Sequence, residues 1–144
     1  MITITRGFNP TEFVGDGWSI IYEETDHRSI ALTELDLSKV ELVTMLKGNE
    51  TYITGEENLS RLKASGKIRL DLDIFLTLWR NQSLIPESWK RKRMIFFDGM
   101  VLWRPNGERC ILGLHWSYGL WCWGFHRLDC DDHRDARYQV SAVL

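Results

Sequence analysis

The sequence has few of the features that mark secreted, membrane-spanning or repetitive proteins. Its three cysteines, Cys110, Cys122 and Cys130, are an odd number without a CxxC pair, and proline is equally scarce. This pattern argues against a disulfide framework and indicates free thiols in a reducing compartment. No run of about 18 apolar residues could span a bilayer, and the first residues show no charged region followed by an apolar run. We therefore expect a cytoplasmic protein without membrane contact.

An excess of charge of one sign is also lacking. The net charge is −2, from 18 basic and 20 acidic residues, so no general attraction for polyanions is expected. Phosphate loops and the HExxH, GxSxG and GxGxxG motifs are absent, and the acidic residues form no recognisable catalytic pair. The sequence therefore indicates no familiar class of enzyme and no cofactor.

Aromatic residues, by contrast, are abundant. There are seven Trp, six Phe and four Tyr, and four of the Trp lie between Trp103 and Trp123. A chain of 144 residues with 44% hydrophobic and 26% charged residues can bury one core without cross-links. No repeat, low-complexity tract or linker divides it. We predict a single α+β domain over residues 1–144.

The helical patterns lie in residues 36–90. Apolar residues recur there at helical spacing in three stretches. A capping residue precedes each stretch, and a glycine follows two of the three. Ahead of them, residues 18–23 and 30–35 have strand composition. Three helices are predicted: one capped by Asp36 or Ser38 and running to about Lys47, one that opens after Thr54 and ends at Gly66, and one capped by Asp71; a last turn begins at Pro86.

From about residue 93 to 127 the apolar pattern changes to a period of two, which indicates strands. The pairs Asp98-Gly99, Asn106-Gly107 and Tyr118-Gly119 divide this region, and such pairs mark hairpin turns. The Tyr118-Gly119 pair is the weakest of the three, since Tyr resists a positive φ. We predict that a four-stranded antiparallel meander follows the helices and packs against them, with a polar tail at residues 129–144.

Two-residue loops would fix the register of this meander. One face would then carry a row of aromatic side chains, which could form a groove for a peptide, a base or a sugar, or could instead be the core on which the helices pack. The candidate binding residues on this face are Trp103, Trp116, Trp121, Trp123 and Phe125. The predicted cross-strand pairs are Phe97–Met100, Ile95–Leu102, Trp103–Cys110, Leu102–Ile111, Leu112–Phe125, Leu114–Trp123 and Trp116–Trp121.

The opposite face has its own candidate site. Gly113 would face Gly124 across a hairpin and leave a hollow that backbone or ligand could enter. His115 and Cys122, also opposed, would border the hollow, and such a pair could supply a base and a nucleophile. The alternative is that a helical aromatic residue such as Trp79 fills the hollow.

One Cys/His pattern and one acidic pattern in the sequence resemble metal sites. In Cys122-x3-His126-x3-Cys130-x2-His133, strand residues four apart would stand about 13 Å from each other, too far to share zinc. The series Asp129-x-Asp131-x-His133-x-Asp135 resembles a calcium loop but has Arg134 and Val140 where glycine and glutamate are required. No metal site is predicted.

The run Lys90–Arg93 is the one basic cluster. It could bind phosphates, but in a chain of net charge −2 a solvated link between helix and strand is the simpler interpretation.

One block of the sequence resembles a known group of proteins. Residues 78–90 end in the segment LIPESWK and run on through Ile95–Gly99; the stretches Arg104–Arg109 and Leu120–Trp123 follow. Together these resemble short uncharacterised bacterial proteins in which this segment leads into a Trp-rich sheet. The resemblance covers about residues 78–144 and implies a bacterial, intracellular protein. It assigns no activity, so no functional residues carry over.

Three functional hypotheses remain. The first is a non-enzymatic module that binds a protein partner through the aromatic sheet or its rim. The second is a small enzyme centred on His115 and Cys122, and the third is a nucleic-acid binder that uses Lys90–Arg93. The exposure of the tryptophans discriminates best among them.

Overall fold

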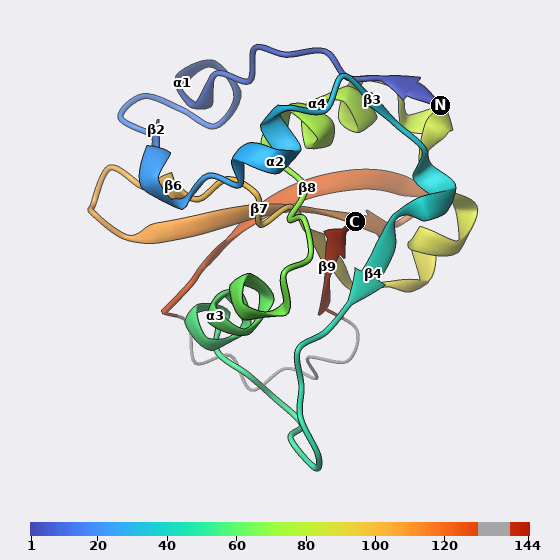
Figure 1. The fold of residues 1–144 in the computed structure, drawn as a ribbon. Helices are drawn as coiled ribbons and strands as arrows, with labels where there is room; N and C mark the ends of the chain where they lie inside the picture. The colour runs from blue at the N-terminus through green and yellow to red at the C-terminus, as the bar shows by residue number, and fades with distance from the viewer. Residues whose placement is uncertain (130–138) are drawn as a thin grey trace.

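A curled sheet runs through the molecule, with helices on both of its faces (Figure 1). The computed structural model describes residues 1–129 and 139–144. Its α-helices are α1 (Pro10–Phe13), α2 (His27–Ile30), α3 (Gly55–Ser65) and α4 (Leu72–Arg80), and its 3-10 helices are η1 (Tyr22–Glu24), η2 (Leu37–Lys39), η3 (Gln82–Leu84) and η4 (Glu87–Arg91). The strands are β1 (Ile2–Thr3), β2 (Ser19–Ile20), β3 (Glu34–Leu35), β4 (Glu41–Val43), β5 (Met94–Phe96), β6 (Leu102–Trp103), β7 (Arg109–Ser117), β8 (Leu120–Arg127) and β9 (Gln139–Val143). The α+β class is confirmed.

The nine-residue strand β7 organises the main sheet. One edge of β7 pairs with β6 near its beginning and with β5 near its end, and the other edge pairs with β8 along its whole length. The sheet continues from β5 through β9 to β4, and from β6 to β2. Strands β1 and β3 form a separate two-stranded sheet.

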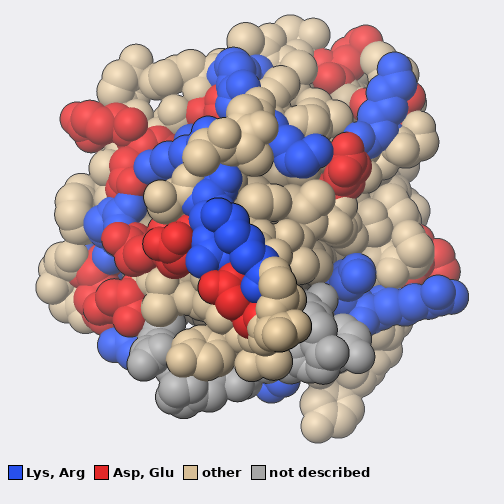
Figure 2. Space-filling view, turned by 60° about the horizontal axis from the view of Figure 1, so that its bottom comes forward, with Lys and Arg blue, Asp and Glu red and all other residues tan. Residues whose placement is uncertain are grey.

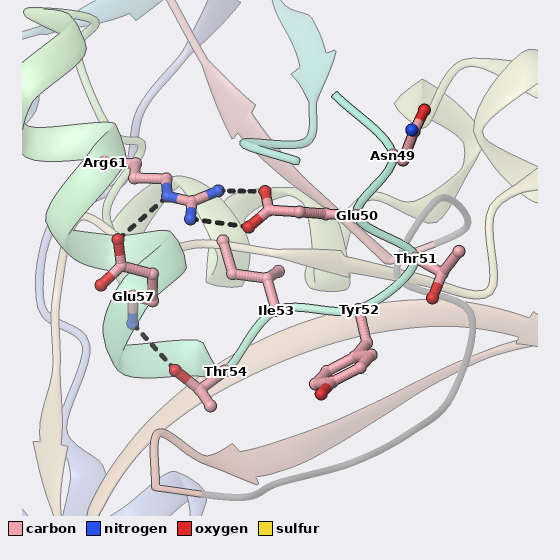
Figure 3. A pocket seen from close by; sticks show the side chains of 8 residues that line it. All are labelled: Asn49, Glu50, Thr51, Tyr52, Ile53, Thr54, Glu57 and Arg61. Atoms are coloured by element: carbon pink, nitrogen blue, oxygen red, sulfur yellow. Dashed lines mark hydrogen bonds and ion pairs between the residues drawn. The ribbon is translucent and has the colours of Figure 1, made fainter. Parts of the chain in front are cut away.

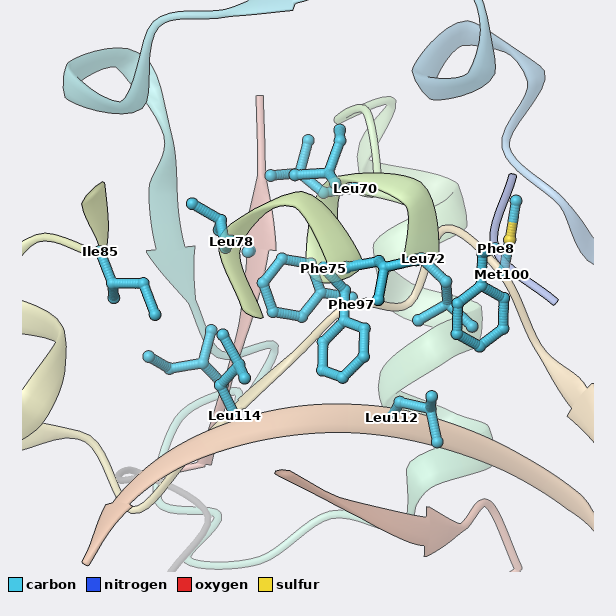
Figure 4. Close-up of a cluster of buried hydrophobic side chains, with 14 of the residues drawn as sticks. Phe8, Leu70, Leu72, Phe75, Leu78, Ile85, Phe97, Met100, Leu112 and Leu114 are labelled. Carbon is cyan, nitrogen blue, oxygen red and sulfur yellow. The ribbon is translucent and has the colours of Figure 1, made fainter. Parts of the chain in front are cut away.

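Helix α4 covers one face of the sheet. Asp71 caps it as predicted, because its carboxylate accepts hydrogen bonds from the backbone N–H groups of Asp73 and Ile74 at 2.8 and 3.1 Å. Every residue from Leu72 to Leu78 is buried. Figure 4 shows Phe75 reaching Phe97 beneath the helix, with ring centroids 5.6 Å apart, and Leu112 and Leu114 of β7 close the core from below.

Helix α3 lies against the opposite face (Figure 1). Its predicted ends are confirmed, since Thr54 Oγ1 accepts a hydrogen bond from the backbone N–H of Glu57 and Gly66 adopts a left-handed conformation with φ of 76°. Leu59 of this helix joins a second apolar cluster with Phe96 and Ile111 of the sheet. Both faces of the sheet are therefore covered in part.

The predicted helix from Asp36 or Ser38 to Lys47 is wrong. Asp36 does cap a turn, but only the short η2 follows it, and the chain then enters β4. Strand β4 pairs antiparallel with β9, where Leu42 opposes Ala142. A partner so far away in the sequence overrides a weak local helical period.

The Asp98-Gly99 pair does not form a hairpin, so the predicted four-stranded meander is not what the chain adopts. Strands β5 and β6 pair with different parts of the same edge of β7 and not with each other, so the predicted pairs Phe97–Met100 and Ile95–Leu102 are wrong. The φ of Gly99 lies outside the left-handed region that a type I′ turn requires. Instead, the Gly99 N–H donates to the carbonyl oxygen of Leu70 at 2.8 Å, where two chain segments cross.

The other two predicted hairpins form. At Tyr118-Gly119 both residues have positive φ, 51° and 77°, and the predicted pairs Leu112–Phe125, Leu114–Trp123 and Trp116–Trp121 are confirmed. The β6–β7 loop holds Pro105 as well as Asn106-Gly107, so Trp103 opposes Arg109 and the predicted pairs Trp103–Cys110 and Leu102–Ile111 are wrong by one residue. That shift places Trp103 on the face opposite Trp121 and Trp123.

The last residues are not the polar tail predicted for positions 129–144. Residues 139–143 form β9, which pairs parallel with β5 and antiparallel with β4. Val140 to Val143 are all buried. A short run of small and β-branched residues suits such a doubly covered strand. Residues 130–138 lie outside the described part of the chain.

Candidate binding surface at the β8 edge

Strand β8 is a long strand at the edge of the main sheet. It has eight residues and pairs with β7 on one side; within residues 1–129 and 139–144 no strand pairs with its other side. Edge strands expose backbone groups that can pair with another chain. We call this side, from Leu120 to Arg127, the β8 edge.

Hydrogen bonds around the hairpin show which backbone groups face the β8 edge. The N–H of Leu128 donates to the carbonyl oxygen of Arg109 at 2.9 Å, in the register that pairs Gly113 with Gly124. In an antiparallel ladder the bonded residues alternate, so the even-numbered residues of β8 bond to β7. The N–H and C=O groups of Trp121, Trp123 and Phe125 therefore point away from β7. No described residue makes a backbone hydrogen bond to them.

Aromatic partners hold the side chains of these three residues. Trp116 lies 5.4 Å from Trp121. Phe13 lies 4.8 Å from Trp123, and Trp18 lies 5.1 Å from Phe125, in each case between ring centroids. Such tilted and edge-on contacts stabilise by about 0.5–1.5 kcal/mol each beyond area burial. The β8 edge is thus a firmly held strand whose outward backbone groups are unpaired in the described part of the chain.

The five predicted binding residues are only partly brought together. Trp121 is buried, Trp116 and Trp123 are half-buried, and Phe125 is 37% exposed. Trp103 is 40% exposed but lies on the other face of the sheet, as described above. The aromatic row is therefore no open groove, because residues of the N-terminal segment cover much of it. The backbone edge could not be predicted from side-chain patterns, because it depends on the order of the strands in the sheet.

An apolar rim surrounds the tip of the β7–β8 hairpin. Tyr118 and Leu120 are exposed, at 101% and 65%, and Leu84 of η3 is 44% exposed. Between the hairpin and the η3–η4 segment lies a pocket of about 300 Å³, which we call the tip pocket. It is lined by Gln82, Ser83, Ile85, Glu87, Lys90, Trp116, Gly119, Leu120 and Trp121.

The hollow predicted at Gly113 and Gly124 is filled. The two glycines do face each other, but the side chain of Met94 from β5 lies over them, and a Cβ on Gly113 would stand 2.7 Å from its sulfur. The occupant is thus a residue from the neighbouring strand and not the helical Trp79. No ligand-sized space remains between the glycines.

His115 and Cys122 are opposed in the register, as predicted. His115 Nδ1 is buried without a hydrogen-bond partner in the described part of the chain, and it borders a cleft of about 220 Å³ with Arg93, Met94, His126 and Gln139. The Cys122 Sγ contacts the carbonyl oxygen of Leu120 at 3.9 Å. Among the described residues no hydrogen bond orients the imidazole toward the thiol, which a nucleophile and its base require.

The side chains of the basic run Lys90–Arg93 differ in their surroundings. The ammonium group of Lys90 lies 3.8 Å from the ring centroid of Trp116 and 3.0 Å from a carboxylate oxygen of Glu87. Arg91 and Arg93 are exposed, and Lys92 is half-buried. Figure 2 shows basic and acidic side chains interleaved over the underside of the molecule, with no continuous basic stripe on that face.

A second pocket, of about 390 Å³, lies between α3 and the loop of residues 49–54 (Figure 3). The Arg61 guanidinium donates to both carboxylate oxygens of Glu50, at 2.6 and 3.0 Å, and to Glu57 at 3.0 Å. The hydrogen bond from Arg61, together with one from the backbone N–H of Lys47, lowers the pKa of Glu50 to about 2. The Arg61 guanidinium already donates hydrogen bonds to two carboxylates. It therefore offers little to an anionic ligand in this pocket.

A buried carboxyl group, that of Asp98, lies just after β5 and contacts Ser141 of β9. Asp98 is almost fully buried; one oxygen accepts a hydrogen bond from Ser141, and the other, Oδ1, has no partner among the described residues. Arg69 donates to the backbone carbonyl of Asp98 at 2.6 Å. Burial raises the pKa of Asp98 to about 6, against the opposing effects of Ser141 and Arg69.

We expect this carboxyl group to make stability depend on pH. Because the folded pKa lies above the unfolded value, Asp98 stabilises the fold most below about pH 4, and this contribution is lost as pH rises through 6. In Asp98→Asn the group cannot ionise. Urea unfolding of both proteins at pH 4 and pH 7 should show the variant gaining about 2 kcal/mol relative to wild type over that range. A difference that stays constant with pH would contradict the assignment.

The predictions concerning metals fall partly outside the structure. Cys130, Asp131, His133 and Asp135 lie beyond the described residues. Within residues 1–129 and 139–144 no group of three or more His, Cys, Asp or Glu side chains could hold an ion, and no helix in those ranges is long and apolar enough to cross a bilayer.

Comparisons with known proteins return nothing: no family model, curated protein or solved structure matches the chain.

Proposed function

We propose that this protein is a non-enzymatic binding module that accepts an extended segment of a protein partner along the β8 edge. The observation that carries the proposal is that the backbone N–H and C=O groups of Trp121, Trp123 and Phe125 have no backbone partner within residues 1–129 and 139–144. An added strand would satisfy these groups, as in other cases of strand addition to a sheet edge.

The composition of the edge supports this proposal. Natural edge strands are usually blunted by lysine, proline or inward-pointing charge, yet residues 120–125 include neither proline nor a charged residue. The edge is also held in place by ring contacts from Phe13 and Trp18. A rigid edge loses little conformational entropy when a partner binds.

The test is a selection from random 12-residue peptides displayed with free carboxyl ends, followed by titration of the enriched sequences as synthetic peptides. The critical variant is Phe125→Pro, which removes an N–H that does not bond to β7 and obstructs the edge. The matched control, Phe125→Ala, removes the same ring but keeps the N–H.

We expect enriched peptides to bind wild type and Phe125→Ala with affinities within a few-fold of each other, and to lose about tenfold or more with Phe125→Pro. Circular dichroism would establish that both variants are folded. Equal binding to Phe125→Pro and Phe125→Ala would sink the proposal, as would a selection that yields no binding sequence.

A further inference from the structure

The tip pocket lies at the end of the β8 edge where β8 begins. Its lining includes Leu120 and Trp121 from β8 and Lys90 from η4. Figure 1 shows the η3–η4 segment, in yellow, at the same end of the sheet as the β7–β8 turn. A strand that ran along the edge toward this end would arrive beside the pocket.

Whether a bound strand runs parallel or antiparallel to β8 decides which of its ends reaches the tip pocket. Antiparallel pairing is somewhat more stable per residue than parallel pairing. A strand antiparallel to β8 runs from Arg127 toward Leu120, so its carboxyl end comes to the tip pocket.

The chemistry of the pocket fits such an end. Ile85, Trp116 and Trp121 offer apolar and aromatic surface for one side chain. The ammonium group of Lys90, held over the Trp116 ring, offers a positive charge at the same place. Its pairing with Glu87 is no obstacle, because the Glu87 side chain is 85% exposed and such a pair contributes little.

Local charge adds to this complementarity. Lys90 is the first of the four cations in the run Lys90–Arg93, and it is the member of that run that lines the tip pocket. A negatively charged chain end is attracted to such a region, whereas a neutral amide is not.

We propose that the β8 edge recognises the free carboxyl terminus of its partner, with an apolar last residue in the tip pocket and the terminal carboxylate paired with Lys90. This inference rests on the proposed function. It narrows the class of partner to proteins with an extended, apolar carboxyl-terminal segment.

The experiment uses the peptides enriched in the selection described above, each synthesised as a free acid and as a carboxyl-terminal amide. Binding of both forms is measured by fluorescence anisotropy to wild type, Lys90→Met and Lys92→Met. Methionine keeps an apolar stem over Trp116 and removes the charge. Lys92 lies outside the pocket lining and is the matched control.

For wild type and Lys92→Met we expect the acid to bind about tenfold more tightly than the amide, since the amide cannot form the charge-assisted hydrogen bond with Lys90. Lys90→Met should bind the two forms equally. If wild type binds acid and amide equally while Phe125→Pro still blocks both, this inference falls and the proposed function stands. If no peptide binds in either form, both fall.

Discussion

Gly99→Ala should destabilise the protein by about 3 kcal/mol or more, the largest effect expected from adding a single methyl group. A Cβ at this position would stand 2.3 Å from the carbonyl oxygen of Arg69 and 2.5 and 2.6 Å from the carbonyl carbon and oxygen of Leu70. These are backbone atoms, which cannot turn aside as a flexible side chain can. The midpoint of urea unfolding measures the loss.

The crossing at Gly99 is also fixed by hydrogen bonds on both sides. Its N–H donates to Leu70 and its carbonyl oxygen accepts from the N–H of Asp26, both at 2.8 Å. The control is Gly124→Ala, where, among the described residues, the new Cβ would meet only the terminal methyl group of Met94 at 3.7 Å. That variant should stay within about 0.5 kcal/mol of wild type. A Gly99→Ala protein as stable as Gly124→Ala would show that the segments do not cross as described.

Asp71→Ala should cost about 3–5 kcal/mol, because this buried carboxylate satisfies donors from three segments. It accepts from the Ser29 hydroxyl at 2.6 Å and from Arg6 at 3.0 Å, besides capping α4 through Asp73 and Ile74. Alanine would leave the hydroxyl and two backbone N–H groups unsatisfied in the interior. Thermal and urea unfolding would both report the change.

Asp36 provides a matched control for Asp71. It caps η2 in a similar way, accepting from the N–H and hydroxyl of Ser38, but these bonds are exposed to solvent. Asp36→Ala should therefore destabilise the protein far less than Asp71→Ala. If the two alanine variants were equally destabilised, the buried network around Asp71 would not be the reason for the loss.

The elements that could be predicted from the sequence are those specified by neighbouring residues. Thr54 and Gly66 bound α3, Asp71 caps α4, and a two-residue turn at Tyr118-Gly119 fixes the register of β7 and β8. In each case the residues that define the element lie within it or next to it, so a short stretch of sequence contains the information.

The rest of the sheet depends on partners that are remote in the sequence. Leu42 pairs with Ala142, and β9 joins β5 in parallel, so neither β4 nor β9 has a local turn that announces it. The Asp98-Gly99 pair misled the prediction for the same reason, because the glycine serves a crossing with Leu70 and not a hairpin.

In the candidate site, too, some features are set by nearby residues and others by residues remote in the sequence. The positions of Trp121, Trp123 and Phe125 on one face could be predicted from the alternation. The extent to which Trp123 and Phe125 are covered could not, because Phe13 and Trp18, which pack against them, come from the other end of the chain. The open backbone of β8 emerges only once the order of all strands is known.

Amide hydrogen exchange of the isolated protein, followed residue by residue by NMR, tests the β8 edge most directly. Within β8 the amides of Cys122, Gly124 and His126 bond to β7, whereas those of Trp121, Trp123 and Phe125 face the edge. We predict slow exchange for the amides that bond to β7 and fast exchange for the amides that face the edge. The edge-facing amides should become slow when a selected peptide is bound. Strong protection of Trp121, Trp123 and Phe125 in the free monomer would contradict an open edge, and with it the proposed function.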